Sequence, residues 1–224
     1  MERDLSGVIP MQIEFAVVEV LLVYDKINIM IKVGITGLQG SGKSYISSLF
    51  EKLGAKIYNS DKRARLLINS IDSLKNEIVS EFENVYDSNN QLIPSKLKDI
   101  VFNTNKGNIL KLNSIVHPYI FKDFQDFCKE NLQSDIILAE SAILFETKMD
   151  VLVDRIIFVD VPYDVRLSNA IKRDGISKDE YDSRMSTQLP LEFKLLNSDF
   201  IIDNSELTDK SDKVKQIYES LTTF

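Results

Sequence analysis

The sequence has 224 residues, 44% of them hydrophobic and 27% charged, as in an ordinary globular protein with one α/β core. Its formal net charge of −7 argues against a nucleic-acid or anionic membrane surface as the main partner, because binders of such surfaces present basic faces. The single cysteine, Cys128, excludes an intramolecular disulfide and a thiolate metal cluster. We expect it to be a small core residue of a cytoplasmic protein.

An apolar stretch, IEFAVVEVLLVYDKI, occupies residues 13–27. It carries Glu14, Glu19 and Asp25, lacks a small-residue cleavage site and is shorter than a membrane span. Two interpretations stay open: an extra strand, or a segment upstream of the natural start at Met30. We favour the second, so the status of residues 1–29 is uncertain and the functional domain is expected over residues 30–224.

A glycine-rich loop lies between a predicted strand and a predicted helix. Apolar residues alternate over residues 31–36, and over 46–53 they recur at helical spacing before Gly54 ends the helix. Between them, residues 37–44 read GLQGSGKS and fit G-x-x-x-x-G-K-[ST], a pattern whose backbone N–H groups surround phosphate oxygens. The sequence therefore predicts a nucleoside triphosphate site.

The residues of this loop have distinct expected roles. Lys43 is expected to reach the β- and γ-phosphates, and Ser44 to place its hydroxyl on Mg²⁺. The helix that follows directs its positive N-terminal end at the same anion. The ATP-binding residues predicted here are Gly37, Leu38, Gln39, Gly40, Ser41, Gly42, Lys43, Ser44 and Tyr45.

A second strand is predicted over residues 55–61, followed by a helix over residues 62–70. Asp61 stands at the junction and has two interpretations. It accepts a proton from a substrate hydroxyl, or it caps the helix, a role for which Ser60 is the alternative. The residues alone do not separate the two.

The next part of the chain, residues 71–130, is helical in pattern and too long for a simple crossover. It predicts a helical insert over about residues 67–133, between core parts 30–66 and 134–224. Strand patterns return at DIILAE, RIIFVDV and DFIID, and a final helix buries Val214, Ile217, Tyr218 and Leu221. Strands that alternate with helices predict a parallel sheet covered on both faces, with ligands at the carboxyl ends of its strands.

Two polar residues outside the loop have a functional and a structural interpretation. Glu140 ends a strand, where P-loop enzymes place an acidic residue near Mg²⁺, and the alternative is a solvated strand end. His117 precedes Pro118, which we expect in the first turn of a helix, so a structural histidine is the default.

A basic pair, Lys172 and Arg173, lies beside Gly175. Charges on helices are usually solvated, but an acidic protein that handles polyphosphate needs local cations. The pair therefore also fits a closing lid, predicted over about residues 166–194 with Gly175 as its hinge.

Two other classes of nucleotide-binding protein can be compared with an enzyme. A GTPase switch needs D-x-x-G and N-K-x-D elements after the loop, and neither follows it. A non-catalytic nucleotide-binding regulator stays open, because only turnover separates it from an enzyme. A small-molecule kinase explains more residues, since it uses the loop, an acceptor-side carboxylate, a helical insert and a basic lid.

Six segments resemble, in order and spacing, the dephospho-CoA kinase family: GITGLQGSGKS, IYNSDKRAR, LNSIVHPYI, SAILFE, RLSNAIKRDGIS and SDFIIDN. The resemblance covers Met30 to the C-terminus. It implies a P-loop NTPase-type, five-stranded parallel sheet with an acceptor-binding insert and a lid. The implied reaction is ATP-dependent phosphorylation of the ribose 3′-hydroxyl of dephospho-CoA, the last step of coenzyme A biosynthesis, with Mg²⁺. We expect no nucleic-acid or membrane partner, and a monomer or weak homo-oligomer.

The resemblance also implies roles for single residues. Asp61 becomes the general base and joins Lys43 among the catalytic residues, Arg65 and His117 lie on the acceptor side, and Asn204 lies near the adenine of ATP. Ser44 and Glu140 are the predicted metal-site residues.

Three positions depart from the family's pattern. Asn59 replaces its first Asp, Ala142 stands where proline is common, and Asn169 occupies a lid position that is usually Arg. The last departure leaves Arg173 as the catalytic cation expected at the γ-phosphate. Another P-loop kinase, of a nucleotide or a small alcohol, is the second interpretation.

Overall fold

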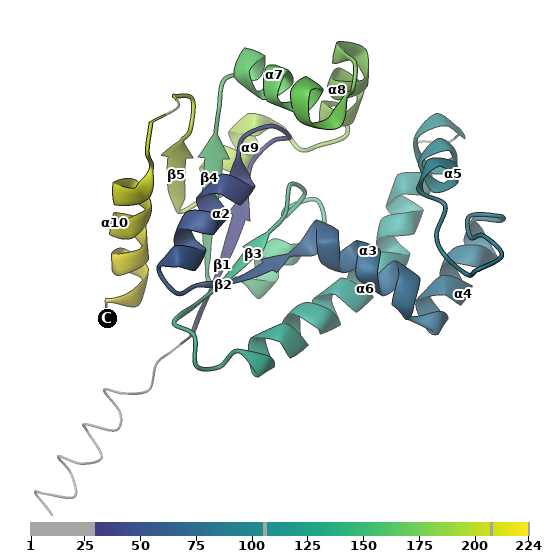
Figure 1. Ribbon diagram of the computed structural model, residues 1–224, viewed down its shortest axis with the longest axis horizontal. Coiled ribbons are helices and arrows are strands. Elements are labelled where there is room, and N and C mark those ends of the chain that lie inside the picture. Colours follow the sequence, from purple (N-terminus) through teal and green to yellow (C-terminus); the bar gives the residue numbers. More distant parts are fainter. Residues whose placement is uncertain (1–29, 105–106, 207, 224) are drawn as a thin grey trace, which may run out of the picture.

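The computed structural model describes residues 30–104, 107–206 and 208–223, which contain a five-stranded parallel sheet (Figure 1). The strand order is β2-β3-β1-β4-β5. The strands are β1 (Ile31–Thr36), β2 (Lys56–Asn59), β3 (Ile136–Glu140), β4 (Arg155–Asp160) and β5 (Phe200–Asp203). The predicted parallel sheet is therefore confirmed, whereas the expectation about residues 1–29 lies outside the described residues.

Helices cover both faces of this sheet, as predicted. Neighbouring residues of a strand point to opposite faces, and in β3 this divides the side chains between two cores. Ile137 and Ala139 join one core, and Ile136 and Leu138 join the other. A strand buried on both faces reads as a continuous apolar run, which is why β3 was recognisable in the sequence.

One face is covered by α2 (Lys43–Lys52) and α10 (Ser211–Thr222). The helix α2 contributes Ile46, Leu49 and Phe50 to their common core, and Gly54 follows it with a φ of +110°, a value that suits glycine. Of the four residues expected to be buried in α10, three are buried and Tyr218 is only partly so. Both helices meet the prediction from apolar spacing, except that Leu53, the last residue of the predicted apolar row, follows α2 and is exposed.

The opposite face is covered by α3 (Ser60–Ser70) and α6 (Gly107–Glu130), and α4 (Asp72–Glu81) packs against these two helices. The short helix α5 (Pro94–Lys98) and the π-helix η1 (Asp99–Thr104) join α4 to α6. Together these elements extend beyond the sheet as a helical lobe (Figure 1). The placement of Pro118 in a first turn was wrong, because this residue lies inside α6. Buried Val116, Ile120 and Phe124 keep one apolar face across the proline, and their packing outweighs one missing backbone hydrogen bond.

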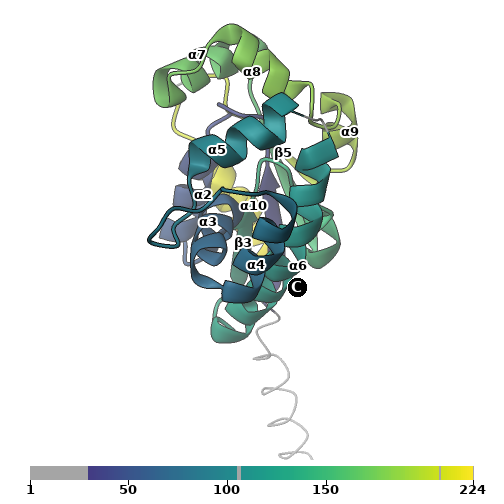
Figure 2. The same ribbon diagram turned by 90° about the vertical axis from the view of Figure 1, so that its right-hand side faces the viewer.

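Three helices lie beyond the carboxyl ends of the strands. They are α7 (Tyr163–Asp174), α8 (Lys178–Met185) and α9 (Leu191–Leu196), and Figure 2 shows α7 and α8 at one end of the molecule. The 3₁₀ helix η2 (Met149–Leu152) follows β3. Buried Arg166 of α7 donates to Val161 O (2.8 Å) and to the Tyr181 hydroxyl (3.1 Å), which donates to Gln39 O (3.1 Å). The α7–α8 pair is thereby tied to the phosphate loop.

The helix after β2 is capped by Asn59, which corrects the expectation for Asp61 and Ser60. The side-chain Oδ1 of Asn59 accepts the backbone N–H of Lys62 at 3.0 Å, and α3 begins at Ser60. β2 ends at Asn59 and α3 begins at Ser60, with no loop between them. The sequence pattern extends the strand to residue 61, and the cap therefore lies earlier in the chain than expected. The Asp61 carboxylate is therefore not needed for capping.

This assignment predicts different stabilities for two variants. Asn59→Ala is expected to lower the free energy of unfolding by about 1 kcal/mol, because it removes the cap. Asp61→Asn is expected to change it by less than about 0.5 kcal/mol, since the exposed carboxylate loses only solvent-screened interactions with the helix dipole and with nearby cations. Urea denaturation of both variants tests this, and a larger loss for Asp61→Asn would return the cap to Asp61.

Candidate active site

The phosphate loop follows β1 and is closely approached from two sides. A Cβ atom at Gly40 would lie 2.2 Å from the carbonyl oxygen of Arg166, and one at Gly42 would lie 2.5 Å from Asn204 Nδ2. Both glycines also have positive φ, +87° and +82°. These two positions therefore require glycine for space as well as for backbone conformation.

Lys43 folds back onto its own loop. Its Nζ donates to Gly37 O at 2.8 Å and to Leu38 O at 3.3 Å. Burial lowers the pKa of Lys43 to about 8, although the carboxylates of Glu140 and Asp61 act in the opposite direction. The loop thus holds a cation that two carboxylates only partly compensate, and an anion bound there would stabilise its charge.

Ser44 and Glu140 bring two oxygen ligands together. The Ser44 hydroxyl donates to Glu140 Oε1 at 2.6 Å, and the Glu140 residue is only 7% exposed. The described ranges contain no cluster of three or more His, Cys, Asp or Glu residues that would form an all-protein metal site. Mg²⁺ commonly takes one or two protein oxygens and completes its shell with phosphate and water, so this pair fits Mg²⁺ bound to a triphosphate.

Asp61 lies in the first turn of α3, in the electrostatic field of the loop. Burial raises the pKa of its carboxyl group, Glu140 raises it further, and Lys43, Arg65 and Arg173 oppose both. The Asp61 side chain is nevertheless exposed to solvent. Its carboxylate borders an open site, whereas protein atoms surround the part of the side chain next to the backbone. We therefore expect the upward shift to be small in the free protein and larger once a substrate covers the carboxylate.

A hollow of about 160 Å³ separates α3 from α6, with Asp61 on its wall. His117 also lines it, half-buried, with its ring stacked on Phe121 at a centroid distance of 6.3 Å, and burial lowers the pKa of His117. Arg65 is exposed on α3 and does not line the hollow. The structure thus brings Asp61 and His117 to one cavity and leaves Arg65 outside it.

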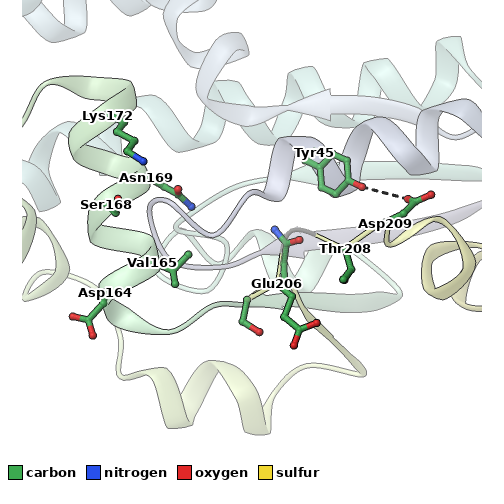
Figure 3. Close-up of a pocket in the computed structure, with 11 residues that line it drawn as sticks. Tyr45, Asp164, Val165, Ser168, Asn169, Lys172, Glu206, Thr208 and Asp209 are labelled. Carbon is green, nitrogen blue, oxygen red and sulfur yellow. Dashed lines mark hydrogen bonds between the residues drawn. The ribbon is translucent and has the colours of Figure 1, made fainter.

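A larger cleft of about 870 Å³ opens on the other side of the phosphate loop (Figure 3). Tyr45 and Asn204 are both among its lining residues. The Tyr45 hydroxyl donates to Asp209 Oδ1 at 3.4 Å, and Asn204 Nδ2 donates to Ser41 O at 2.9 Å. The full lining is Tyr45, Asp164, Val165, Ser168, Asn169, Lys172, Asn204, Ser205, Glu206, Thr208 and Asp209.

The basic pair Lys172 and Arg173 adjoins the phosphate loop through α7. Asn169 Nδ2 donates to Gly40 O at 2.9 Å, and Lys172 and Arg173 line a hollow of about 340 Å³ with Gly40 and Gly42. Figure 3 shows Asn169 and Lys172 leaving α7 on the side of the phosphate loop.

Arg173 is paired with its neighbour on α7. Its guanidinium donates twice to Asp174, at 2.8 Å each, and Gln39 Nε2 donates to the same carboxylate at 2.7 Å. A bound phosphate would therefore compete with Asp174 for Arg173.

Sequence reasoning missed Lys194, which is completely buried on α9. Its Nζ lies 2.8 Å from Glu146 Oε1 and donates to Gln188 Oε1 at 3.1 Å. The charge of Lys194 contributes to the lowering of the Lys43 pKa, so it lies within electrostatic range of the loop. No sequence signal identified it, because a single lysine on a short helix is normally solvent-exposed.

The site has a phosphate loop whose Ser44 hydroxyl is bonded to Glu140, and a separate hollow lined by a second carboxylate, Asp61. These two features define a P-loop small-molecule kinase. The family model for dephospho-CoA kinase matches residues 31–209. The chain belongs to the dephospho-CoA kinase family.

Curated relatives agree with this assignment. The dephospho-CoA kinase of Fusobacterium nucleatum is 35% identical over 196 residues, which cover 87% of this chain and all of that protein. The Aquifex aeolicus enzyme is 32% identical, with coverages of 86% and 98%. The Carboxydothermus hydrogenoformans enzyme is 37% identical over 77% of this chain and 85% of its own.

Solved structures support the fold. The dephospho-CoA kinase of Campylobacter jejuni aligns with a TM-score of 0.62 at 25% identity, over 87% of this chain and 98% of that one. Shikimate kinase from Acinetobacter baumannii aligns with a TM-score of 0.54 at 12% identity, over 88% and 96%, and shows the shared fold alone. Within the described ranges, no helix is long and apolar enough to cross a membrane.

The lowered pKa of Lys43 predicts how ATP binding depends on pH. Below pH 8 Lys43 is charged in the free protein, and above pH 8 it increasingly loses its proton. Triphosphate favours the charged form, so binding above pH 8 is expected to take up a proton and to weaken by up to about tenfold per pH unit. Isothermal titration calorimetry between pH 7.5 and 9.5, in buffers of different ionisation enthalpy, measures both effects.

Lys43→Met is the control for this experiment, since it removes the titrating group. Its weaker binding is expected to lose the proton uptake above pH 8. The same proton uptake in this variant would assign the titration to another residue.

Proposed function

We propose that this chain transfers the γ-phosphoryl group of ATP to the ribose 3′-hydroxyl of dephospho-CoA, giving coenzyme A and ADP. One observation carries the proposal: Asp61 lines the hollow between α3 and α6 and is also coupled electrostatically to Lys43 and Glu140 of the triphosphate site. A single carboxylate thus serves both substrates. Membership of the dephospho-CoA kinase family supports this choice of acceptor.

On the donor side, the triphosphate lies in the loop and the adenosine in the large cleft. Backbone N–H groups of residues 37–44 and the Lys43 ammonium bind the phosphates, and Tyr45 and Asn204 border the adenosine. Ser44 and Glu140 hold Mg²⁺, which supplies charge neutralisation at the β- and γ-phosphates when bound.

On the acceptor side, Asp61 orients the 3′-hydroxyl and takes its proton. The hydroxyl oxygen forms a bond to the γ-phosphorus as the bond from that phosphorus to the β,γ-bridging oxygen breaks, and the electron pair leaves with ADP. A raised pKa makes Asp61 a better proton acceptor than an ordinary carboxylate. Since phosphoryl transfer through a loose transition state demands little of the nucleophile, orientation is the larger part of its role.

The helical elements around the site have matching roles in this proposal. Residues about 67–133 form the acceptor-binding insert, with His117 in the hollow and Arg65 at the outer, charged part of the acceptor. Residues about 166–194 form a lid from which Arg173 reaches the γ-phosphate. The expected cytoplasmic location and weak or absent self-association stay predictions.

A panel of acceptors tests the proposal against its alternatives. The protein is incubated with Mg-ATP and dephospho-CoA, nucleosides, nucleoside monophosphates or small alcohols, and ADP and the phosphorylated product are measured. Selective phosphorylation of dephospho-CoA is expected. Preference for another acceptor would assign a different P-loop kinase, and ATP binding without any transfer would favour the regulator.

The Asp61→Asn variant separates catalysis from structure. Asparagine keeps the size of the side chain but cannot take the proton, so kcat with dephospho-CoA is expected to fall by about 10²–10⁴-fold. The dissociation constant for ATP and the melting temperature are expected to change little. A folded variant that keeps most of its activity at saturating substrates would contradict the role of Asp61.

Arg173→Ala tests the lid. We expect turnover to fall by on the order of tenfold or more while stability changes by less than about 0.5 kcal/mol, because an exposed ion pair contributes little to folding. Lys129→Ala is the matched control, since Lys129 forms an exposed ion pair with Asp126 on α6. Equal effects of the two substitutions on turnover would leave Arg173 as a solvated surface charge.

A further inference from the structure

Two polar side chains of α6 face the acceptor hollow without a hydrogen-bonding partner among the described residues. They are Asn113 and His117, one helical turn apart and both half-buried. The other uncharged polar side chains that line this hollow, Ser60, Ser141 and Thr147, are engaged with protein atoms. The amide of Asn113 therefore keeps its donor and its acceptor for a ligand.

The rest of the wall is apolar and partly flat. Ala64 and Ile68 of α3 face Val116 and Ile120 of α6 across the hollow, and Ile143 and Met149 close it. The His117 ring lies nearly parallel to Phe121, at an interplanar angle of 13°. Burial lowers the pKa of His117, so the ring is neutral at pH 7. An apolar wall with one free amide and a neutral aromatic pair matches a nucleobase, which needs a flat site and a directional polar contact.

The size of the hollow agrees with that chemistry. Its volume is about 160 Å³, and an apolar cavity of about 150 Å³ accommodates a benzene-sized ring. Asp61 lies on the wall of the hollow and is exposed to solvent, so a base in the hollow can leave its ribose on that side. The hollow is too small for a whole nucleotide.

A polar network links the elements on either side of the hollow. Asp123 of α6 accepts hydrogen bonds from the Tyr58 hydroxyl of β2, at 2.8 Å, and from the guanidinium of Arg63 on α3. The Arg63 guanidinium also lies over the Tyr58 ring, 5.9 Å from its centroid. This network fixes the separation of α3 and α6, so a base enters a preformed space.

We propose that the hollow binds the adenine ring of the acceptor and that Asn113 selects adenine by pairing with its N6 amino group and N7. A side-chain amide is complementary to this donor–acceptor edge. With adenine in the hollow, the attached ribose lies at the Asp61 wall, where the 3′-hydroxyl is needed. The proposal rests on the proposed function and makes Asn113 a specificity-determining residue for it.

Discrimination between two acceptors tests the proposal. The hypoxanthine analogue of dephospho-CoA carries O6 in place of the amino group, so the Asn113 amide can keep only one of its two hydrogen bonds. The protein is expected to prefer the adenine acceptor in kcat/KM by at least about fivefold. In Asn113→Leu, of similar size but without the amide, this ratio is expected to fall toward one, with the KM for ATP unchanged.

Ser114→Ala is the matched control, because Ser114 is the exposed neighbour and bonds only to Lys111 O. It is expected to keep the full discrimination. Asn113→Ala repeats the test without added bulk in case leucine blocks the hollow or disturbs folding, which thermal melting detects.

Three results would overturn the assignment. The first is equal use of both acceptors by the unaltered protein, and the second is unchanged discrimination in both Asn113 variants. The third is loss of phosphorylation of both acceptors to the same extent, with the ratio preserved, which would indicate a structural role or a pantetheine site. Failure of the unaltered protein to phosphorylate either acceptor would instead overturn the proposed function, and the two failures are therefore distinguishable.

Discussion

The site depends on the register of three neighbouring strands. Ile35 of β1 pairs with Glu140 of β3, and Glu140 pairs with Asn59 of β2. At this one level of the sheet, β1 leads into the phosphate loop, β3 supplies the acid beside Ser44, and β2 leads into the turn that carries Asp61. A slip of one residue in either pairing would turn the side chains of a strand to the opposite face. The buried alternation in β3 prevents such a slip, so core packing fixes the geometry of the charged groups.

These groups explain how an acidic protein holds a polyanion. Glu140 raises the pKa of Lys43 against the larger effect of burial, and Lys194 of α9 adds a buried positive charge that lowers it. In the free protein these cations are engaged within the chain: Lys43 with loop carbonyls, Arg173 with Asp174, and Lys194 with Glu146. A triphosphate would replace the loop carbonyls as the partner of Lys43 and Asp174 as the partner of Arg173. The cost in side-chain ordering is small, because both cations are already held near the phosphate positions.

The sequence predicted the sheet and the loop because both have strong local patterns. Buried parallel strands give continuous apolar runs, and the phosphate loop needs glycine at the close approaches to Arg166 and Asn204. Features that depend on tertiary contacts were missed or misplaced. Asn59 is the cap because β2 leads directly into α3. Pro118 lies inside α6 because buried residues on both sides of it pack as one helix. Lys194 could not be identified from the sequence, since the partners that make a buried lysine tolerable, Glu146 and Gln188, are brought to it by the fold.

Two departures from the family's pattern also follow from this arrangement. A carboxylate at position 59 would stand close to Asp61 and Glu140 and raise the cost of keeping them ionised, whereas Asn59 caps α3 without a charge. At position 169 the neutral amide bonds to Gly40 O and joins α7 to the loop, and positive charge lies one turn further along, at Lys172 and Arg173. The contact with the loop and the positive charge are thus divided between Asn169 and its neighbours. Asn169 thus fixes α7 against the loop, while Arg173, one turn further along the same helix, pairs with Asp174.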